Sequence, residues 1–375
     1  MAQAIACGFQ FRAGTNHRLT LAAAYKSRDN RRNSLNLTEN FVPDPAKLGL
    51  QISLGSGPVR ERLAVAKEAE ELGYSSLWVA EVSGPDALVS LTALALNTSK
   101  VDLATGVIPI QIRTPGAMAM SFLTINEYSQ GRAVAGLGVS SPVIVERWHG
   151  ASYRKPVTAM RECVTIMRQL FTEGRSKFQG EVYKSDFRLG MRISAPRPPR
   201  IYLAVLNAPM LRLAGEIADG VLMNYSPPDA VAPMVAEIRA GEAQAGRAAG
   251  SVDIGIYARM CITPDVDKAI QSFKRELAGY AFVDSYNKMF ARYGLKDEFA
   301  EVRRLWGLGK RDEAPGAISD SNATKIAAFG TADAGREFVA RFRAAGVTHP
   351  VVFPIGPAAT FTRDYTVTMR ALAGA

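Results

Sequence analysis

Cysteine and long apolar runs are scarce in this sequence. Its 375 residues include 3 cysteines, at positions 7, 163 and 261, and these form no C-x-x-C pair. The spacing excludes a disulfide scaffold and a cysteine-rich zinc module, so no metal site is expected, and a reducing cytoplasm is the expected compartment. No apolar run approaches the roughly 18 residues that a membrane-spanning helix needs, so we expect a soluble protein without a membrane partner.

The sequence also lacks a basic stripe, which is the usual mark of a nucleic-acid-binding surface. Its net charge is +10, but residues 1–40 hold six Arg or Lys against Asp29 and Glu39, so the rest of the chain carries +6. This excess is too small for a nucleic-acid partner, whereas a mildly basic body suits a polyanionic small molecule. With 47% hydrophobic and 21% charged residues, the chain has an ordinary globular balance, which excludes disorder and fibres.

Residues 1–45 differ from the rest, because they show neither the period of a strand nor that of a helix. The segment is rich in arginine and poor in acids, as organelle transit peptides are, but it has no continuous apolar core of the secretory type. We interpret it as a flexible N-terminal extension, which a start codon placed too early would explain, with true targeting as the alternative. Residues 46–375 are predicted to form a single domain.

From residue 47 onward, short apolar strands alternate with amphipathic helices eight times. This pattern predicts a parallel sheet covered by helices. Eight units fit a closed (β/α)8 TIM barrel of the α/β class better than an open sheet, because no G-x-G-x-x-G follows the first strand. Insertions are predicted near residues 143–155, 175–190 and 280–325, the second as a surface hairpin. The predicted strands are 48–53, 76–80, 101–106, 133–137, 201–205, 220–223, 254–261 and 350–353.

Small residues follow several of these strands, at the barrel face where such folds carry their chemistry. Gly106, Gly138 and the pair Ser140-Ser141 remove side-chain bulk, so a planar cofactor could lie against the backbone. The segment 207–209, Asn-Ala-Pro, opens a helix whose free N–H groups would attract an anion. The alternative is that these glycines and prolines simply turn the loops.

Histidine is scarce as well, with three in the chain. His17 lies in the extension, and His349 precedes the last strand at the opposite, structural face. His149 is thus the one imidazole expected at the catalytic face, where it could carry a proton near neutral pH; a structural histidine beside Trp148 is the alternative.

Glu81 closes the second strand at the same face. There it could anchor a ring nitrogen of a cofactor, or it could form a plain ion pair with Arg113.

Four longer motifs also stand out in the sequence: TGVIPIQIRTP at 105–115, NEYSQGR at 126–132, GLGVSSPVIVERWHG at 136–150 and LRLAGEIADG at 211–220. Together they resemble the bacterial-luciferase-like oxidoreductases, and the likeness is closest to the branch that uses the deazaflavin coenzyme F420 rather than FMN. The most specific motif is the third, which begins Gly-Leu-Gly-Val-Ser-Ser-Pro and ends Trp-His-Gly. The likeness covers about residues 47–373, and nothing in the family corresponds to residues 1–45.

The resemblance implies a (β/α)8 barrel, usually dimeric, whose cofactor ring lies over a strand-three bulge with a non-prolyl cis peptide. That bulge corresponds to Gly106-Val107. In the relatives, the end of strand two, the segment after strand four and the start of helix five hold the ring and the phosphate. Those positions are here Glu81, Val139, Ser140, Ser141, Asn207, Ala208, Met210 and Leu211.

The sequence also departs from individual members of the branch. Its sugar-phosphate dehydrogenases have a histidine and a glutamate where this chain has Val82 and Ser141, which argues against sugar-phosphate oxidation. The methylenetetrahydromethanopterin reductases usually carry a histidine where this chain has Arg113-Thr-Pro, so that substrate is not expected either.

These observations predict an F420-dependent oxidoreductase that moves a hydride between C5 of the deazaflavin and a small organic substrate. Glu81 and Arg113 would position ring and substrate, and His149 or Glu146 would handle the proton. Two alternatives remain: an FMN-dependent monooxygenase of the same family, and a non-catalytic barrel that only binds flavin. A homodimer is expected by analogy.

Overall fold

Eight parallel strands close into the barrel that the alternation predicts. The computed structural model describes residues 47–52, 59–357 and 361–375, so the expected extension over residues 1–45 lies outside the described residues. Each strand pairs with its neighbours in chain order, and pairing of the first strand with the last completes the ring. The barrel strands are β1 (Gly49–Gln51), β2 (Ser76–Val79), β3 (Asp102–Thr105), β5 (Ala133–Gly138), β8 (Arg200–Ala204), β9 (Gly220–Met223), β10 (Asp253–Ile262) and β12 (His349–Pro354).

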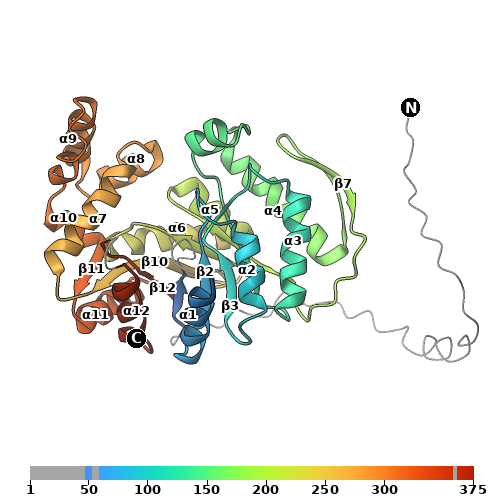
Figure 1. Cartoon of the computed structure of the whole chain (residues 1–375). Coiled ribbons are helices and arrows are strands. Elements are labelled where there is room, and N and C mark those ends of the chain that lie inside the picture. The colour runs from blue at the N-terminus through green and yellow to red at the C-terminus, as the bar shows by residue number, and fades with distance from the viewer. Residues whose placement is uncertain (1–46, 53–58, 358–360) are drawn as a thin grey trace, which may run out of the picture. The chain divides into compact units, whose positions relative to one another are not determined.

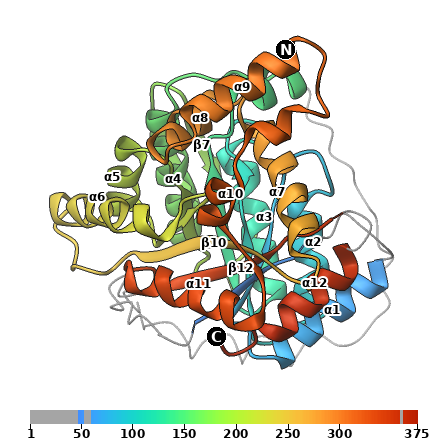
Figure 2. The same ribbon diagram turned by 90° about the vertical axis from the view of Figure 1, so that its left-hand side faces the viewer.

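Helices cover the outside of this barrel, and most of them return the chain to the start of the next strand; α7 leads into an insertion, and α12 ends the fold (Figures 1 and 2). The large apolar core lies between the strands and these helices. They are α1 (Val59–Glu71), α2 (Ala87–Ala95), α3 (Pro115–Tyr128), α4 (Pro156–Glu173), α5 (Ala208–Ile217), α6 (Val231–Gln244), α7 (Val266–Tyr280), α11 (Ala332–Ala344) and α12 (Phe361–Ala371).

The interior of the barrel is filled by a second, smaller cluster of side chains. Trp78, Tyr202 and Tyr257 are buried there, and the Trp78 ring lies edge-on to both tyrosines at centroid distances of 5.5 and 6.5 Å. Rings of this size close the barrel below the carboxyl ends of its strands. Any ligand site must therefore lie above them.

A buried polar network lies at the amino ends of the strands, the face opposite the expected site. The Asp253 carboxylate accepts hydrogen bonds from Lys47 Nζ at 2.5 Å, Thr348 Oγ1 at 2.5 Å, His349 Nδ1 and the Tyr202 hydroxyl. Burial alone would raise the pKa of Asp253, but His349 and Lys47 hold that pKa well below its ordinary value. His349 is the first residue of β12 and contacts Asp253 in this network, so its expected place at the structural face is confirmed. Burial lowers the pKa of His349.

The predicted surface hairpin is present as β6 (Arg175–Gln179) paired antiparallel with β7 (Lys184–Arg188). Its turn is held from α4, because the buried Glu162 carboxylate accepts the backbone N–H groups of Glu181, Val182 and Tyr183 at 2.6–2.9 Å. A single carboxylate of the preceding helix thus binds three N–H groups at the turn of the hairpin.

The largest insertion follows α7 and has an apolar core of its own, built around rings such as Phe273, Phe290 and Phe299. Its helices α8 (Asp284–Arg292) and α9 (Lys296–Gly307) lie toward the opposite end of the barrel from α1 and α12 in both views (Figures 1 and 2). The insertion ends with α10 (Asp320–Ile326) and the strand β11 (Ala327–Gly330), which pairs with the end of β10 and was not predicted.

The motif at 126–132 has a structural role rather than a place in the site. The buried Arg132 guanidinium donates to the backbone carbonyls of Ala95, Thr98, Val101 and Ser129. It thereby ties the end of α2 and the start of β3 to the turn before β5.

Candidate active site

One cavity of about 510 Å³ opens at the carboxyl ends of the strands. Gly106, Ser140 and Asn207, which follow three different strands, all line it. Of the residues predicted for the site, it is lined by Glu81, Gly106, Val107, Val139, Ser140, Ser141, Asn207 and Met210. Arg113, Glu146, His149, Ala208 and Leu211 do not line it.

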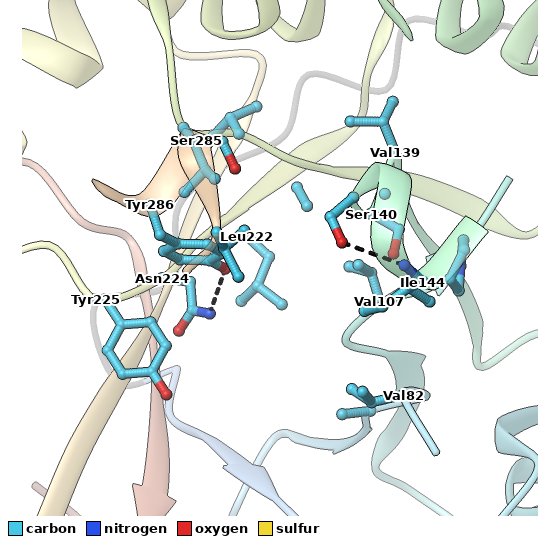
Figure 3. Close-up of a pocket in the computed structure, with 18 of the residues that line it drawn as sticks. Val82, Val107, Val139, Ser140, Ile144, Leu222, Asn224, Tyr225, Ser285 and Tyr286 are labelled. Atoms are coloured by element: carbon cyan, nitrogen blue, oxygen red, sulfur yellow. Dashed lines mark hydrogen bonds between the residues drawn. The ribbon is translucent and has the colours of Figure 1, made fainter. Parts of the chain in front are cut away.

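The two sides of the cavity differ in chemistry. Figure 3 shows Val82, Val107 and Val139 on one side and Asn224, Tyr225 and Tyr286 on the other. The first side follows strands β2, β3 and β5 and is mostly apolar, with the Ser140 hydroxyl among the valines, whereas the second carries hydroxyl and amide groups from the end of β9 and from the insertion. A flat apolar group with a polar partner would suit the space between them.

The peptide bond between Gly106 and Val107 is cis, as the resemblance implies. Gly106 is required by its packing, since a Cβ there would lie 1.8 Å from the Tyr257 hydroxyl, which donates to the Gly106 carbonyl at 2.8 Å. Likewise, a Cβ on Gly138 would lie 2.5 Å from a methyl group of Val107. These glycines therefore make room for neighbouring side chains, not for a bare patch of backbone.

Two residues that line the cavity have a left-handed backbone although neither is glycine. Ser140 has φ of 56° and Tyr225 has φ of 55°. Such conformations are held by surrounding structure and cluster at ligand sites. They sit on opposite sides of this cavity (Figure 3).

Glu81 forms the ion pair that the sequence offered as one of two interpretations. Both of its oxygens pair with the Arg113 guanidinium, and one also accepts the Ala87 N–H at 2.9 Å. Arg113 reaches on to Asp86 at 2.6 Å, and Asp86 caps the start of α2. Burial raises the pKa of Asp86, but the Val89 N–H and Arg113 outweigh it and lower that pKa. Glu81 is thus held rigidly at the cavity wall.

The start of α5 offers fewer free donors than the sequence suggests. The Asn207 side-chain oxygen accepts a hydrogen bond from the Met210 N–H at 3.2 Å, and the Asn207 backbone carbonyl accepts one from the Leu211 N–H at 2.9 Å. Proline at 209 has no N–H, so of the first four positions only Ala208 keeps a donor that does not bond to Asn207.

The sequence analysis did not predict the buried polar cluster that lies on the second side. The Arg259 guanidinium lies 3.5 Å from the centroid of the Tyr225 ring, and its Nε pairs with Glu276 at 3.1 Å. The Tyr225 hydroxyl donates to the same carboxylate. The signal in the sequence was Arg259 itself, since a charge within an apolar strand needs a buried partner.

Glu146 and His149 lie on the first insertion, around a π-helical turn over Val143–Trp148. Both side chains are exposed, and Glu146 accepts the Tyr153 N–H at 3.3 Å. Their proton-transfer role stays a prediction.

Within the described ranges, no group of three or more His, Cys, Asp or Glu residues is arranged to hold a metal ion. Over the same ranges, no helix is long and apolar enough to cross a membrane.

A (β/α)8 barrel with its large cavity at the carboxyl ends of the strands is the architecture of TIM-barrel enzymes. The sequence profile of the family described as luciferase-like monooxygenase matches residues 40–349. The chain therefore belongs to the luciferase-like monooxygenase family, and it is an enzyme of the oxidoreductase type.

Individual relatives narrow the likeness further. The 5,10-methylenetetrahydromethanopterin reductase of Archaeoglobus fulgidus is 33% identical over 300 residues, covering 78% of this chain and 89% of the relative. The structure of the coenzyme F420 dependent tetrahydromethanopterin reductase from Methanopyrus kandleri matches with a TM-score of 0.73 at 25% identity, over 87% of this chain and 97% of that one. An F420-dependent secondary alcohol dehydrogenase in complex with an F420–acetone adduct shares the fold, with a TM-score of 0.71 at 18% identity over 88% and 98% of the two chains.

Proposed function

We propose that the protein is an F420-dependent oxidoreductase that transfers a hydride between the deazaflavin and a small organic substrate. The cavity between the apolar and the polar side is the observation that carries this proposal. Its volume lies within the range of about 300–1,000 Å³ that is usual for small-molecule sites. The likeness to the coenzyme F420 dependent reductase of Methanopyrus kandleri supports the choice of cofactor.

The residues present fit a tricyclic ring. Val107 and Val139 offer apolar contact on one side, and the small side chains of Ser140 and Ser141 leave room at the edge. The Ala208 N–H, which follows the cavity-lining Asn207, and the positive end of the α5 dipole would face the phosphate outside the cavity. When bound, the deazaflavin supplies a carbon that carries the hydride. Glu81 lines the cavity, and its ion pair with Arg113 fixes the position of its carboxylate there.

Binding of the cofactor is tested by titrating the purified protein with F420 and, separately, with FMN, using cofactor fluorescence. We expect saturable binding of F420. Micromolar binding of FMN without binding of F420 would instead favour the FMN-dependent monooxygenase. Binding of F420 without turnover over a panel of activated alkenes, imines and quinones would favour a barrel that only stores cofactor.

A matched pair of variants locates the cofactor. Val82 lines the cavity and is 53% exposed, so Val82→Trp would fill space there without disturbing the core. Leu308, at the end of α9, is 61% exposed and does not line the cavity, so Leu308→Trp is the control. We expect at least about tenfold weaker F420 binding in the first variant only; equal binding in both would place the cofactor elsewhere.

We propose in addition that the protein is a cytoplasmic homodimer that pairs through α2 and α3. These helices pack together, and four apolar side chains on them or at their ends are exposed, with 47–71% of each accessible: Val89, Leu96, Met120 and Tyr128. Exposed apolar patches of this kind mark protein interfaces. Sedimentation velocity of the wild type and of Val89→Asp is the test; a monomeric wild type would refute it.

A further inference from the structure

A chain of two hydrogen bonds leads from Arg259 through Asn224 to Tyr286, which lies on the insertion helix α8 and lines the cavity. We propose that the Tyr286 hydroxyl donates a hydrogen bond, and in turnover a proton, to the acceptor atom of an uncharged carbonyl or imine substrate. This inference rests on the proposed hydride transfer and adds to it the substrate class and the proton donor. Tyr286 lies opposite Val107 across the cavity (Figure 3).

The direction of the chain follows from the Arg259 guanidinium, which has donors and no acceptor. Its Nη1 donates to the Asn224 side-chain oxygen at 2.5 Å, so the amide nitrogen of Asn224 must point the other way. That nitrogen donates to the Tyr286 hydroxyl oxygen at 3.0 Å. The Tyr286 oxygen is thus occupied as an acceptor, and its own O–H needs an acceptor elsewhere. Within the described ranges no protein atom accepts it, and Tyr286 lines the cavity.

The charge of Arg259 is balanced within the wall and does not form an anion site. Arg259 is 3% exposed, is paired with Glu276, and lies between the rings of Tyr225 and Phe353 at 3.5 and 4.3 Å. Among the described residues that line the cavity, Arg259 is the sole cation, whereas Glu81 and Glu276 are acidic. A phosphate or carboxylate would meet no unpaired cation here, so the geometry favours a neutral acceptor.

Burial, Asn224 and Arg259 together favour donation of a hydrogen bond or proton by the Tyr286 hydroxyl. Burial raises the pKa of Tyr286, and this keeps the hydroxyl protonated at neutral pH; the Asn224 hydrogen bond and the Arg259 charge act in the opposite direction. Both would stabilise the phenolate that forms once the proton has left. Arg259 and Asn224 are accordingly positioning residues, and Tyr286 is the residue that contacts the substrate.

The reduction balances with the groups named. A bound reduced deazaflavin would supply the hydride from its C5 carbon, so a C–H bond would break there and another would form on the substrate carbon. The π electrons of the C=O or C=N bond would move to the oxygen or nitrogen, which would take the proton as the Tyr286 O–H bond breaks. The substrate would be reduced and the deazaflavin oxidised, and Tyr286 would regain its proton from solvent when the product leaves.

Two variants remove the donor by different routes. Tyr286→Phe deletes the hydroxyl. Asn224→Asp keeps the size of the side chain and its pairing with Arg259, but the new carboxylate can only accept, so Tyr286 would donate to it and turn its proton away from the cavity. Tyr293→Phe is the control, because Tyr293 belongs to the same insertion and bonds to Ser226 at 3.1 Å without lining the cavity.

The readout is ligand binding to the cofactor-free protein, with cyclohex-2-en-1-one and 1-pyrroline as carbonyl and imine probes. We expect each probe to bind the wild type and Tyr293→Phe equally, and roughly three- to tenfold more weakly to Tyr286→Phe and Asn224→Asp. The hydrocarbon 3-methylenecyclohexene, which has no acceptor, should bind all four proteins alike. The C=O stretch of bound cyclohexenone should lie lower in the wild type than in either donor variant.

Equal affinities across the four proteins, or no binding of either probe to the wild type, would overturn the assignment of Tyr286. Thermal melts of each variant separate loss of the donor from loss of the fold. Since no cofactor is present, the outcome is independent of the F420 titration. If Tyr286→Phe and Asn224→Asp bind the probes more weakly but the wild type binds no F420, Tyr286 is still the hydrogen-bond donor and the proposed F420-dependent function is refuted.

Discussion

Replacing Asp253 with asparagine would remove the charge at the centre of the buried network below the barrel. The carboxylate is fully buried and accepts from Lys47, Tyr202, Thr348 and His349. The amide keeps the shape but leaves the buried Lys47 ammonium without its carboxylate. Removing one partner of a buried pair costs about 3–5 kcal/mol. With an unfolding entropy of about 2.1 cal/mol/K per residue, the 375 residues lose about 0.8 kcal/mol of stability per degree near Tm. The substitution would therefore lower Tm by about 4–6 °C.

The pH dependence of this effect follows from the direction of the pKa shifts. The pKa of Asp253 is lower in the folded protein than the ordinary value of about 3.9, so its contribution is present above that value and is lost as the pH falls toward the folded pKa. The pKa of His349 is lowered too, so its contribution is lost as the pH falls below about 6.5. Acid should therefore destabilise the wild type, and the gap to Asp253→Asn should narrow below about pH 4.

Equilibrium unfolding in urea at pH 7.5, 5.5 and 3.5 measures both effects. Lys47→Met with Asp253→Asn completes a double-mutant cycle, and the double variant should lose less free energy of unfolding than the two single losses added together. An Asp253→Asn variant within about 1 kcal/mol of wild type at pH 7.5, or a gap that widens in acid, would refute this reasoning.

Three further outcomes are expected. Glu162→Ala should lower the free energy of unfolding by about 2–4 kcal/mol and expose the hairpin to proteolysis, since three backbone N–H groups lose their acceptor; unchanged protease resistance would contradict this. Gly215→Ala should lower the free energy of unfolding by at least about 2 kcal/mol, because the new Cβ would lie 2.1 Å from the Ile238 carbonyl oxygen of α6. Gly307→Ala is the control: its Cβ would meet no atom within 4 Å, so a thermal melt should show a neutral or stabilising effect. Arg113→Met should weaken F420 binding at least about tenfold by releasing Glu81, and fluorescence titration with unaltered affinity would count against that anchor.

Much of the barrel could be predicted because its signals are local. Apolar runs of four to eight residues and the helical spacing between them depend on nearby sequence, so the eight barrel strands occur where they were predicted. The strand β11 was not predicted, because Ala327–Gly330 shows no alternation of polar and apolar residues and forms a strand by pairing with β10. The N-terminal extension over residues 1–45 and the single domain over residues 46–375 stay predictions.

The site was predictable on one side only. Gly106, Ser140 and Asn207 follow strands, so their position in the chain sufficed to bring them to one cavity. The second side depends on how an insertion folds over the barrel, and nothing local to Tyr286 indicates that its hydroxyl meets Asn224. The reason given for the glycines was also incomplete, because only the structure shows that Tyr257 occupies the space at Gly106.

A crystal structure of the protein soaked with F420 tests the central claim most directly. We predict density for the deazaflavin ring inside the cavity, in van der Waals contact with Val107 on one side and with space for a small substrate below Tyr286 on the other. A ring bound outside this cavity, or no bound cofactor at saturating F420, would contradict the account.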